Sequence, residues 1–554
     1  MAAPFTGPTP SDPNPHRPDP TDPAQPVAGP GPALSRRRLL TLGAAGLAVA
    51  GLGVGGFELT RRPSAPSLQA IGPRSPLVAA TEAARSTTGK IVSQTLTAAP
   101  TTVDLGGRVV NTWAYNGSVG TPLIRVTAGD RVDVHLLNQL TDPTTVHWHG
   151  LALRNDMDGV PGVTMDPVAP ATDFQYSFTA PHPGTYWFHP HVGVQMDRGL
   201  QGALIIDDPQ EPGGYDQEAV LILDDWTDGW SDTPDAILAR LGRDGMRMGG
   251  SSGMGSGGMG SGGMGSGGMG GMNMGGTVSA TQPLGTDTGD VVYPAHLING
   301  RLPQDPVTVS AKPGQRIRFR LVNAGSDTAY RFAVGGHRLT VTHADGYPVQ
   351  PVEVDTVLLG MGERYDVVVT AGDGAFPIVA SPEGKGDPAA QAVLRTSSGP
   401  APAIGARPVE LDGRLLAHAD LVPTAAAALS VQQPDRQLDL TLGMVNGGRQ
   451  WVLNGVPYDQ HQALDVSSGQ RVRITLRNQT MMFHPMHLHG HTFAVVTGSG
   501  SAATPGVRKD TVNVLPMQTL AIDLDTDNPG QWLAHCHNAY HGELGMMTVM
   551  SYTV

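Results

Sequence analysis

Short apolar and polar runs alternate along most of this chain, with turns between them. From Thr121 to Leu140, an apolar run, an Ala-Gly-Asp turn and a second run with apolar residues at every other position follow one another. Period-two spacing is typical of a half-buried strand, and a Gly-Asp pair is typical of a turn. The pattern therefore predicts two short strands joined by a tight turn.

The same shape recurs in Val307–Gly325 and in Ala463–Thr480. In each copy, a strand meets a Gly-Asp-Arg or Gly-Gln-Arg turn, and the next strand ends in Leu-x-Asn. The copies lie roughly 150 to 190 residues apart, which indicates three homologous β-domains rather than a short-period solenoid. Short strands with regular turns fit Greek-key sandwiches. The predicted fold class is therefore all-β, with three consecutive Greek-key β-sandwich domains.

Composition agrees with turn-rich β-structure, because the 554 residues include 73 glycines and 47 prolines and only 15% are charged. The formal net charge of -13 argues against a nucleic-acid partner, since phosphate binding needs clustered lysine and arginine. A single cysteine, Cys536, excludes an internal disulfide.

The N-terminal 75 residues are predicted to be a disordered leader with an export signal. Arg36 and Arg37 precede the apolar run 39–57 and resemble a twin-arginine signal. The run is rich in Gly and Ala and weakly hydrophobic for a membrane span. We expect export to the cell envelope, the periplasm or the exterior, without stable membrane insertion after processing. The alternative is a leader retained as a single-pass anchor.

Histidine is the most informative residue type, because ten of the 19 histidines fall in four short motifs. The motifs are HWHG with His147 and His149, HPH with His189 and His191, HPMHLHG with His484, His487 and His489, and HCHNAYH with His535, His537 and His541. Side chains alternate across a strand, so both histidines of a His-x-His pair should project from one face. Four such pairs could bring eight imidazoles together, and imidazole suits Cu, Zn, Fe and Ni.

The same alternation predicts a second metal site at the lone thiol. If His535 and His537 face one way, Cys536 faces the other, where its thiolate can bind a metal. His484, His541 and Met546 are spaced so that they can reach that site. Two His, one Cys and a weak axial Met make the ligand set of a blue-copper centre. One strand would thus join an electron-accepting copper to a histidine cluster.

The order and spacing of these motifs resemble the multicopper oxidases, a laccase-like family of three cupredoxin domains, over about residues 85–554. The resemblance implies four coppers per chain. It also implies domains at 85–212, 215–400 and 405–554, of which the second lacks ligand motifs and is a spacer.

The resemblance assigns the ligands motif by motif. The type 1 copper takes His484, Cys536, His541 and Met546; the type 2 copper takes His147 and His487; one type 3 copper takes His149, His189 and His537, and the other takes His191, His489 and His535. Met547 is the alternative axial ligand, but Met546 has the family spacing.

Relatives carry an acid near the three-copper cluster, and its place here is Asp158, with Asp156 as the alternative. Such an acid would hydrogen-bond copper-bound water and deliver protons. A second acid directly follows the last type 1 histidine in many relatives. That place is Gly542 here, and Glu543 comes one residue later.

The remaining histidines have ordinary interpretations. His491 is expected to support packing or hydrogen bonds. The others lack ligand spacing and are expected to be surface or core residues: His135, His182, His337, His343, His418 and His461.

The implied activity is oxidation of a reducing substrate at the type 1 copper, with electrons passing through Cys536 to His535 or His537 and on to O2, which becomes water. Phenols, aromatic amines and Cu(I) are all open as substrates. The alternative function is copper sequestration without turnover. A simple electron-transfer cupredoxin would not need eight imidazoles, and a copper nitrite reductase lacks the His-Cys-His arrangement.

The insertion 246–276 is a Gly- and Ser-rich segment with eight methionines. It cannot bury enough surface to form a packed element. A simple flexible linker is one interpretation. Capture of Cu(I) is the other, because thioethers are soft ligands that select Cu(I).

Overall fold

The computed structural model of the chain describes residues 69–211, 213–245, 279, 281–498 and 503–554. The twin-arginine segment 35–57 and the methionine-rich insertion 246–276 lie outside the described residues. The described α-helices are α1 (Pro76–Ala83), α2 (Pro234–Asp244) and α3 (Ala539–Glu543). Within these ranges, no helix is long and apolar enough to cross a membrane.

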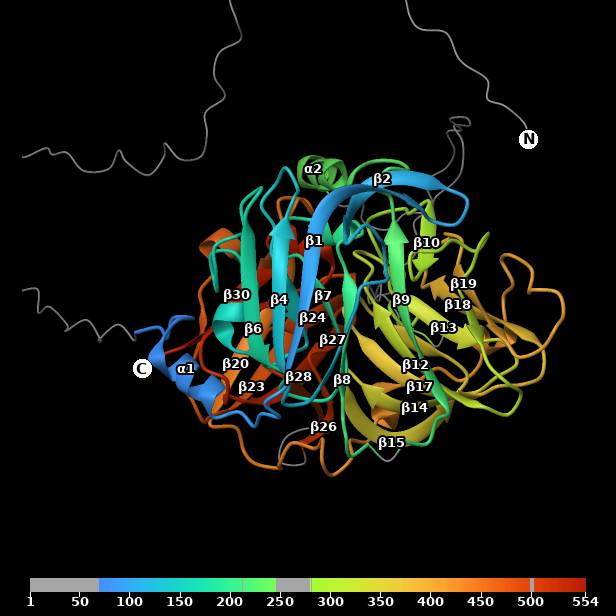
Figure 1. The fold of residues 1–554 in the computed structure, drawn as a ribbon. Coiled ribbons are helices and arrows are strands. Elements are labelled where there is room, and N and C mark those ends of the chain that lie inside the picture. The colour runs from blue at the N-terminus through green and yellow to red at the C-terminus, as the bar shows by residue number, and fades with distance from the viewer. Residues whose placement is uncertain (1–68, 212, 246–278, 280, 499–502) are drawn as a thin grey trace, which may run out of the picture. The chain divides into compact units, whose positions relative to one another are not determined.

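Strands are the main regular elements of the described chain, and they assemble into three consecutive pairs of sheets (Figure 1). The first pair has the orders β2-β1-β4-β6 and β3-β8-β7-β5. Its strands are β1 (Ile91–Asp104), β2 (Val109–Tyr115), β3 (Leu123–Thr127), β4 (Arg131–Asn138), β5 (His147–His149), β6 (Asp173–Thr179), β7 (Gly184–His189) and β8 (Gly202–Asp207).

The second pair has the orders β10-β9-β12-β17-β14-β15 and β11-β19-β18-β13-β16. Its strands are β9 (Gln217–Trp226), β10 (Ala295–Ile298), β11 (Thr308–Ser310), β12 (Arg316–Asn323), β13 (Tyr330–Val334), β14 (Leu339–Ala344), β15 (Tyr347–Val354), β16 (Val357–Leu359), β17 (Arg364–Thr370), β18 (Ala375–Pro382) and β19 (Ala390–Arg395).

The third pair has the orders β21-β20-β23-β28-β25-β26 and β22-β30-β29-β24-β27. Its strands are β20 (Arg436–Val445), β21 (Gln450–Leu453), β22 (Leu464–Val466), β23 (Arg471–Asn478), β24 (His484–Leu488), β25 (Phe493–Thr497), β26 (Thr504–Lys509), β27 (Thr511–Val514), β28 (Thr519–Asp525), β29 (Gln531–Cys536) and β30 (Met547–Tyr552).

The three pairs share one topology. The opening strand β1, β9 or β20 lies parallel to β4, β12 or β23, respectively. In the second sheet, β3, β11 and β22 lie parallel to β8, β19 and β30. Neighbours that are not consecutive along the chain are expected of Greek-key connections. The predicted all-β class is thereby confirmed, and we propose that each pair is one domain with the predicted bounds 85–212, 215–400 and 405–554.

Each sequence repeat is the connection between the two sheets of its pair. The repeats form β3–β4, β11–β12 and β22–β23, and the two strands of each repeat belong to different sheets. Their turns contain Gly129, Gly314 and Gly469, with φ angles of 87°, 83° and 81°. Glycine adopts this left-handed conformation without steric cost, which explains the repeated glycine.

The asparagine that ends each repeat closes the loop behind it. The side chains of Asn138, Asn323 and Asn478 each donate to a carbonyl oxygen four or five residues ahead, and each accepts from the N–H two residues ahead. In the first and third pairs, these loops lead into β5 and β24. The repeats therefore help to fix the start of the histidine motifs.

Candidate metal centres

The histidine motifs stand at neighbouring strand ends of the first and third pairs of sheets. His147 and His189 lie opposite each other on β5 and β7. His487 and His535 lie opposite each other on β24 and β29. Cross-strand partners are close neighbours, so strand pairing alone brings these rings together.

In three of the four His-x-His pairs, the strand that the alternation argument assumed ends before the second histidine. Strands β7, β24 and β29 end before His191, His489 and His537, which lie in the loops that follow. In the HPH motif, Pro190 has no N–H with which to continue the ladder, and this explains the strand end. Only His147 and His149 share a strand throughout.

Eight imidazoles nevertheless converge in three groups. The candidate ligand atoms of each group lie within 4.8 Å of one another. The groups are His147, His149 and His487; His149, His189 and His537; and His191, His489 and His535. Every group combines motifs from the first and third pairs of sheets, so the cluster exists only where these two pairs meet.

Hydrogen bonds at one ring nitrogen orient several of these imidazoles. Nδ1–H of His147 donates to the Asp158 carbonyl oxygen at 2.8 Å, and that of His487 donates to a backbone carbonyl at 2.9 Å. His189 and His535 each donate to the carbonyl of the next residue, also at 2.9 Å. When Nδ1 carries the proton, Nε2 keeps a free lone pair.

Inward-facing nitrogens of the cluster have no protein partner. The Nε2 atoms of His147, His189 and His487 are buried and find no hydrogen-bond partner among the described residues. An unpaired buried polar atom costs about 1–3 kcal/mol. A bound metal ion removes that cost, so the residues present fit a metal cluster.

A separate group surrounds the lone thiol. Cys536 Sγ lies 3.6 Å from Nδ1 of His484 and 3.6 Å from Nδ1 of His541. Nε2–H of His484 donates to the Thr480 hydroxyl at 2.8 Å, and Nε2–H of His541 donates to the Asp290 carboxylate at 2.9 Å. Both rings therefore present Nδ1 to the sulfur.

Met546 is tied to this group through its backbone. Its carbonyl accepts the Cys536 N–H at 3.1 Å, and its own N–H donates to the His541 carbonyl at 2.9 Å. Met546 is fully buried. Met547 instead lies opposite His535 on β30.

Comparison with known proteins decides what these groups belong to. Family models described as multicopper oxidase match residues 97–211, 217–399 and 431–554. The multicopper oxidase MmcO of Mycobacterium tuberculosis is 45% identical over 527 residues, which cover 95% of this chain and 99% of that protein. The chain belongs to the multicopper oxidases.

More distant relatives agree with this membership. A copper resistance protein A homolog of Pseudomonas syringae pv. tomato is 28% identical over 81% of this chain and 90% of that protein. The crystal structure of a laccase from Botrytis aclada matches with a TM-score of 0.66 and 26% identity, over 84% of this chain and 88% of that chain.

Membership of the multicopper oxidases makes the protein a copper-dependent oxidoreductase that passes electrons from a reducing substrate to O2. Copper is the cofactor of the family, and the histidine groups are consistent with it. Thiolate and imidazole are ligands that copper accepts readily.

One acid of this multicopper oxidase lies against the histidine cluster. Asp158 is buried, and its Oδ2 accepts from Nδ1–H of His489 at 2.9 Å. Its Oδ1 lies 3.3 Å from Nδ1 of His147 and has no hydrogen-bond partner. Asp156 instead makes two hydrogen bonds with Arg154, at 2.7 and 2.8 Å. Of these two candidates, Asp158 is the one that reaches the cluster.

A narrow hollow reaches the cluster beside α3. Glu543 lines it together with residues that include His189, His191, His535 and His537. Burial raises the pKa of Glu543 to about 7. A carboxyl group thus lies near the cluster one residue after Gly542, the position expected for a second acid.

Sequence reasoning missed several residues that hold the rings. Thr480, Asp290, Asp510 and Thr511 each contact a motif histidine. None belongs to a ligand motif, and the only available signal was that Thr480 follows a Leu-x-Asn repeat.

His491 has the supporting position predicted for it. Its Nε2 is hydrogen-bonded to the Tyr552 hydroxyl at 2.7 Å. Its ring also stacks on that of Tyr552, with the ring centres 5.7 Å apart.

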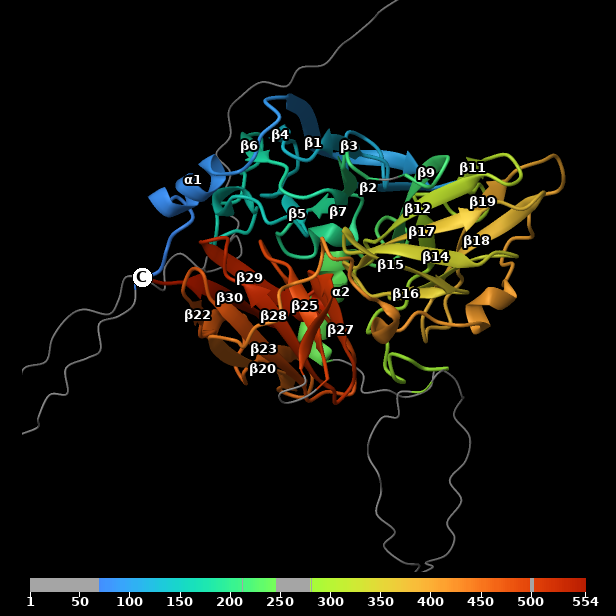
Figure 2. The same cartoon turned by 90° about the horizontal axis from the view of Figure 1, so that it is seen from below.

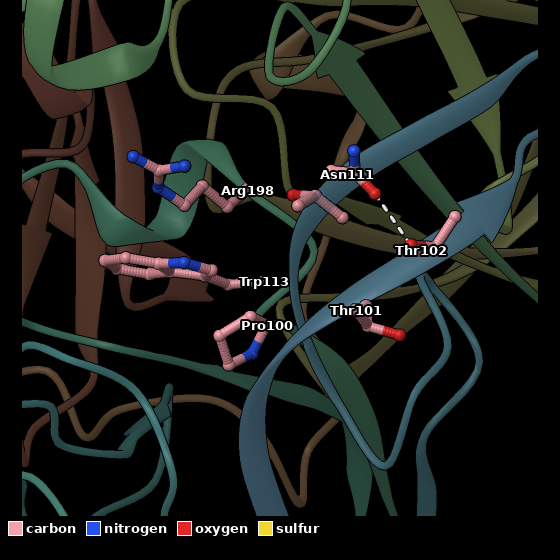
Figure 3. A pocket seen from close by; sticks show the side chains of 7 residues that line it. Pro100, Thr101, Thr102, Asn111, Trp113 and Arg198 are labelled. Carbon is pink, nitrogen blue, oxygen red and sulfur yellow. Dashed lines mark hydrogen bonds between the residues drawn. The ribbon is translucent and has the colours of Figure 1, made fainter. Parts of the chain in front are cut away.

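An open hollow of about 390 Å³ on the first pair of sheets is separate from the metal groups (Figure 3). Its lining is Pro100, Thr101, Thr102, Asn111, Thr112, Trp113 and Arg198. The Arg198 guanidinium stacks over the Trp113 ring at 4.2 Å and donates to Asp228 at 2.7 Å. No lining residue belongs to a metal group found in the described chain.

Burial of neutral imidazoles makes the copper-free protein sensitive to acid. Burial is the main cause, and the neighbouring rings the second, that holds the pKa of five histidines well below 6.5. These are His149, His189, His191, His489 and His537. Below pH 6.5, the unfolded chain therefore binds protons that the folded chain does not. For each pH unit below 6.5, each such histidine lowers the free energy of unfolding by up to about 1.4 kcal/mol.

We therefore expect the melting temperature of the copper-free protein to fall steeply from pH 7 to pH 5, measured by calorimetry. His541 opposes this loss only weakly. Burial lowers its pKa, but Asp290 and Cys536 raise it to about 10, so the stability that it contributes rises slightly as the pH falls from 7 and is complete below pH 6.5. A His135→Asn control, at a half-exposed histidine, should keep the same slope. A melting temperature independent of pH would contradict the expectation.

Proposed function

We propose that this multicopper oxidase binds four coppers in the groups described above. The type 1 copper takes His484, Cys536, His541 and Met546; the type 2 copper takes His147 and His487; one type 3 copper takes His149, His189 and His537, and the other takes His191, His489 and His535. The observation that carries the proposal is that the imidazole nitrogens of each set, and the Cys536 sulfur with those of His484 and His541, lie within 4.8 Å of one another.

When bound, copper supplies one-electron oxidation of the substrate and four-electron reduction of O2 to water. Cys536 is joined through its own backbone to His535 and His537, so one short stretch of chain connects the two centres. Cys536 is 1% exposed, and this burial keeps water from the sulfur. The protein thereby gives electrons a covalent route between a substrate-facing site and the histidine cluster.

Asp158 is our candidate for proton delivery at the cluster. Its Oδ2 is engaged by His489, whereas its Oδ1 has no partner and can accept or return a proton. Glu543, which lines the hollow beside α3, is the candidate for the second acid. Together they would supply protons from two sides of the cluster.

We propose Cu(I) as the reducing substrate. Eight methionines of the insertion 246–276 offer soft thioether ligands. The described stretches on both sides of that insertion contact residues beside His541. Helix α2, which is green in Figure 2, packs against α3. Asp290 accepts a hydrogen bond from His541.

Relatives carry names that fit two substrates, since some are called copper resistance proteins and others laccases. Phenol oxidation therefore remains the second candidate. Copper sequestration without turnover is the weaker alternative, because the complete cluster has the residues needed for O2 reduction.

We also propose export by the twin-arginine route, supported by Arg36, Arg37 and the apolar run 39–57. This route carries folded proteins, which suits a chain that must first acquire its cofactor. Cell fractionation, which locates the protein, checks the proposal.

Cys536→Ser should abolish both the intense thiolate-to-copper absorption and O2 uptake, while the other three copper positions stay filled. A serine oxygen is too hard a ligand for this site and does not continue the electron route. Absorption spectra, copper analysis and an oxygen electrode measure the three effects. Met547→Leu is the matched control and should stay blue. A blue Cys536→Ser protein would refute the assignment.

Asp158→Asn should keep the copper content but slow O2 reduction, and more strongly as the pH rises, because a carboxyl group near the cluster no longer transfers protons. We expect a loss of about 10² to 10⁴-fold, the range typical of general acid–base groups. Asp156→Asn, two residues away and paired with Arg154, should retain the rate. The assignment fails if Asp156→Asn is the slow variant.

Replacing the eight methionines of the insertion by serine should slow Cu(I) oxidation at low Cu(I) concentration and leave phenol oxidation unchanged. Serine keeps the length and flexibility of the segment but removes its soft ligands. Steady-state rates with both substrates measure the effect. Equal Cu(I) rates in the variant and the parent would favour the phenol oxidase instead.

A further inference from the structure

Domain two, the second pair of sheets, supplies no ligand but reaches the histidine cluster at the turn before β17. Gly362 in that turn has a φ of 85°. A Cβ atom on it would lie 2.9 Å from Cε1 of His149 and 2.9 Å from Cδ2 of His537. Real side chains do not fit at such distances, so the bare backbone of domain two forms part of the cluster wall.

Arg364, the first residue of β17, is fully buried two residues after this glycine. Its Nη1 and Nη2 donate to the two carboxylate oxygens of Asp510 at 2.7 and 2.6 Å. Its Nε and Nη1 also donate to the carbonyls of Thr185 and Gly362, both at 3.1 Å. Arginine holds a carboxylate in a fixed plane through this fork, and lysine cannot do so.

Asp510, which Arg364 holds in place, contacts two rings of the cluster. Its carbonyl accepts from Nδ1–H of His487 at 2.9 Å, and its Oδ1 lies 3.2 Å from Nε2 of His149. The Thr511 hydroxyl donates to the same Oδ1 at 2.9 Å. It also lies 3.1 Å from Nε2 of His149 and 3.1 Å from Nδ1 of His487. The rings of His149 and His487 stack with their centres 3.8 Å apart.

Lys509 is a second buried cation next to Asp510, but its ion pairs are with other carboxylates. Lys509 pairs with Asp345 at 3.2 Å and with Glu363 at 3.0 Å. Arg364 is thus the one arginine or lysine in the described chain that forms an ion pair with Asp510. If the fork is lost, the Thr511 hydroxyl still donates to Oδ1 of Asp510, but no cation holds the plane of the carboxylate against His149.

We propose that Arg364 is a positioning residue of the copper cluster: through Asp510, it fixes the rings of His149 and His487. Domain two is then a working part of the metal centre rather than the spacer that its missing ligand motifs predicted. The inference rests on the proposed ligand assignment, in which these two rings belong to a type 3 and to the type 2 copper.

The test is Arg364→Lys in the full chain, which keeps the charge and loses the fork. We expect the cluster to bind its type 2 copper about 10- to 100-fold more weakly, the loss typical of removing a residue that orients a metal ligand. Copper content after dialysis and the type 2 paramagnetic resonance signal report this. The blue absorption should remain, because Arg364 does not contact Cys536, His484 or His541.

Arg320→Lys is the matched control. Arg320 is also buried in domain two and donates to Glu218 and to the Thr185 hydroxyl, both at 2.9 Å. Within the described chain, it makes no hydrogen bond or ion pair with a motif histidine. It should keep the type 2 signal and the copper content. The melting temperatures of the copper-free variants show how much each substitution destabilises the fold.

The inference is overturned if Arg364→Lys keeps the type 2 signal and the copper content of the parent. It is also overturned if Arg364→Lys and Arg320→Lys lose them equally. If Arg364→Lys does not fold, Asp510→Asn decides, since it leaves the arginine in place and breaks the next link. An unchanged type 2 signal in that variant overturns the inference, and a selective loss supports it. A parent without copper would overturn the ligand assignment as well, which separates the two failures.

Discussion

Eight imidazoles are packed against one another in the protein interior, and much of the surrounding structure serves to keep them neutral and oriented. A charged imidazole there would be unsolvated and repelled by its neighbours, which is why burial and the adjacent rings lower the pKa values of His149, His189 and His537. A neutral ring has one N–H to satisfy and one lone pair to offer. For His147, His189, His487 and His535, a backbone carbonyl accepts from the N–H, and the lone pair is left to face inward.

Those acceptors come from different parts of the fold. Asp158 follows β5, Asp510 stands between β26 and β27, and Pro190 and Cys536 offer their backbone carbonyls beside the rings that they hold. Because the first and third pairs of sheets both contribute rings to every group, a shift between them would misalign all three groups at once. The ion pair between Arg364 and Asp510 ties the second pair of sheets to the same point.

The sequence predicted the fold and the residues that gather, but not the reasons for all of their positions. Periodicity and the repeated glycine and asparagine predicted the strand pairs, because those signals are local. The alternation argument assumed strands that continue through each pair, but β7, β24 and β29 end before His191, His489 and His537, because a strand's end depends on its neighbours and on Pro190. The roles of Asp290 and Asp510 could not be predicted, because hydrogen-bond partners that are far apart in the sequence produce no recognisable sequence spacing. The separation of Asp158 from Asp156 likewise needed the observed pairing of Asp156 with Arg154.

The two groups present different nitrogens of the histidine ring, and the position of the hydrogen-bond acceptor decides which nitrogen is left free. In much of the cluster, a carbonyl holds Nδ1, which is near the backbone, so Nε2 extends into the shared interior. At the thiol, Thr480 and Asp290 hold Nε2, so Nδ1 of His484 and His541 faces the sulfur. Binding through Nδ1 keeps a metal close to the strand that carries Cys536, whereas binding through Nε2 lets rings from distant strands reach common ions. The nitrogen that the protein satisfies therefore distinguishes the compact group around Cys536 from the wider group of imidazoles, and residues 535–537 contribute to both.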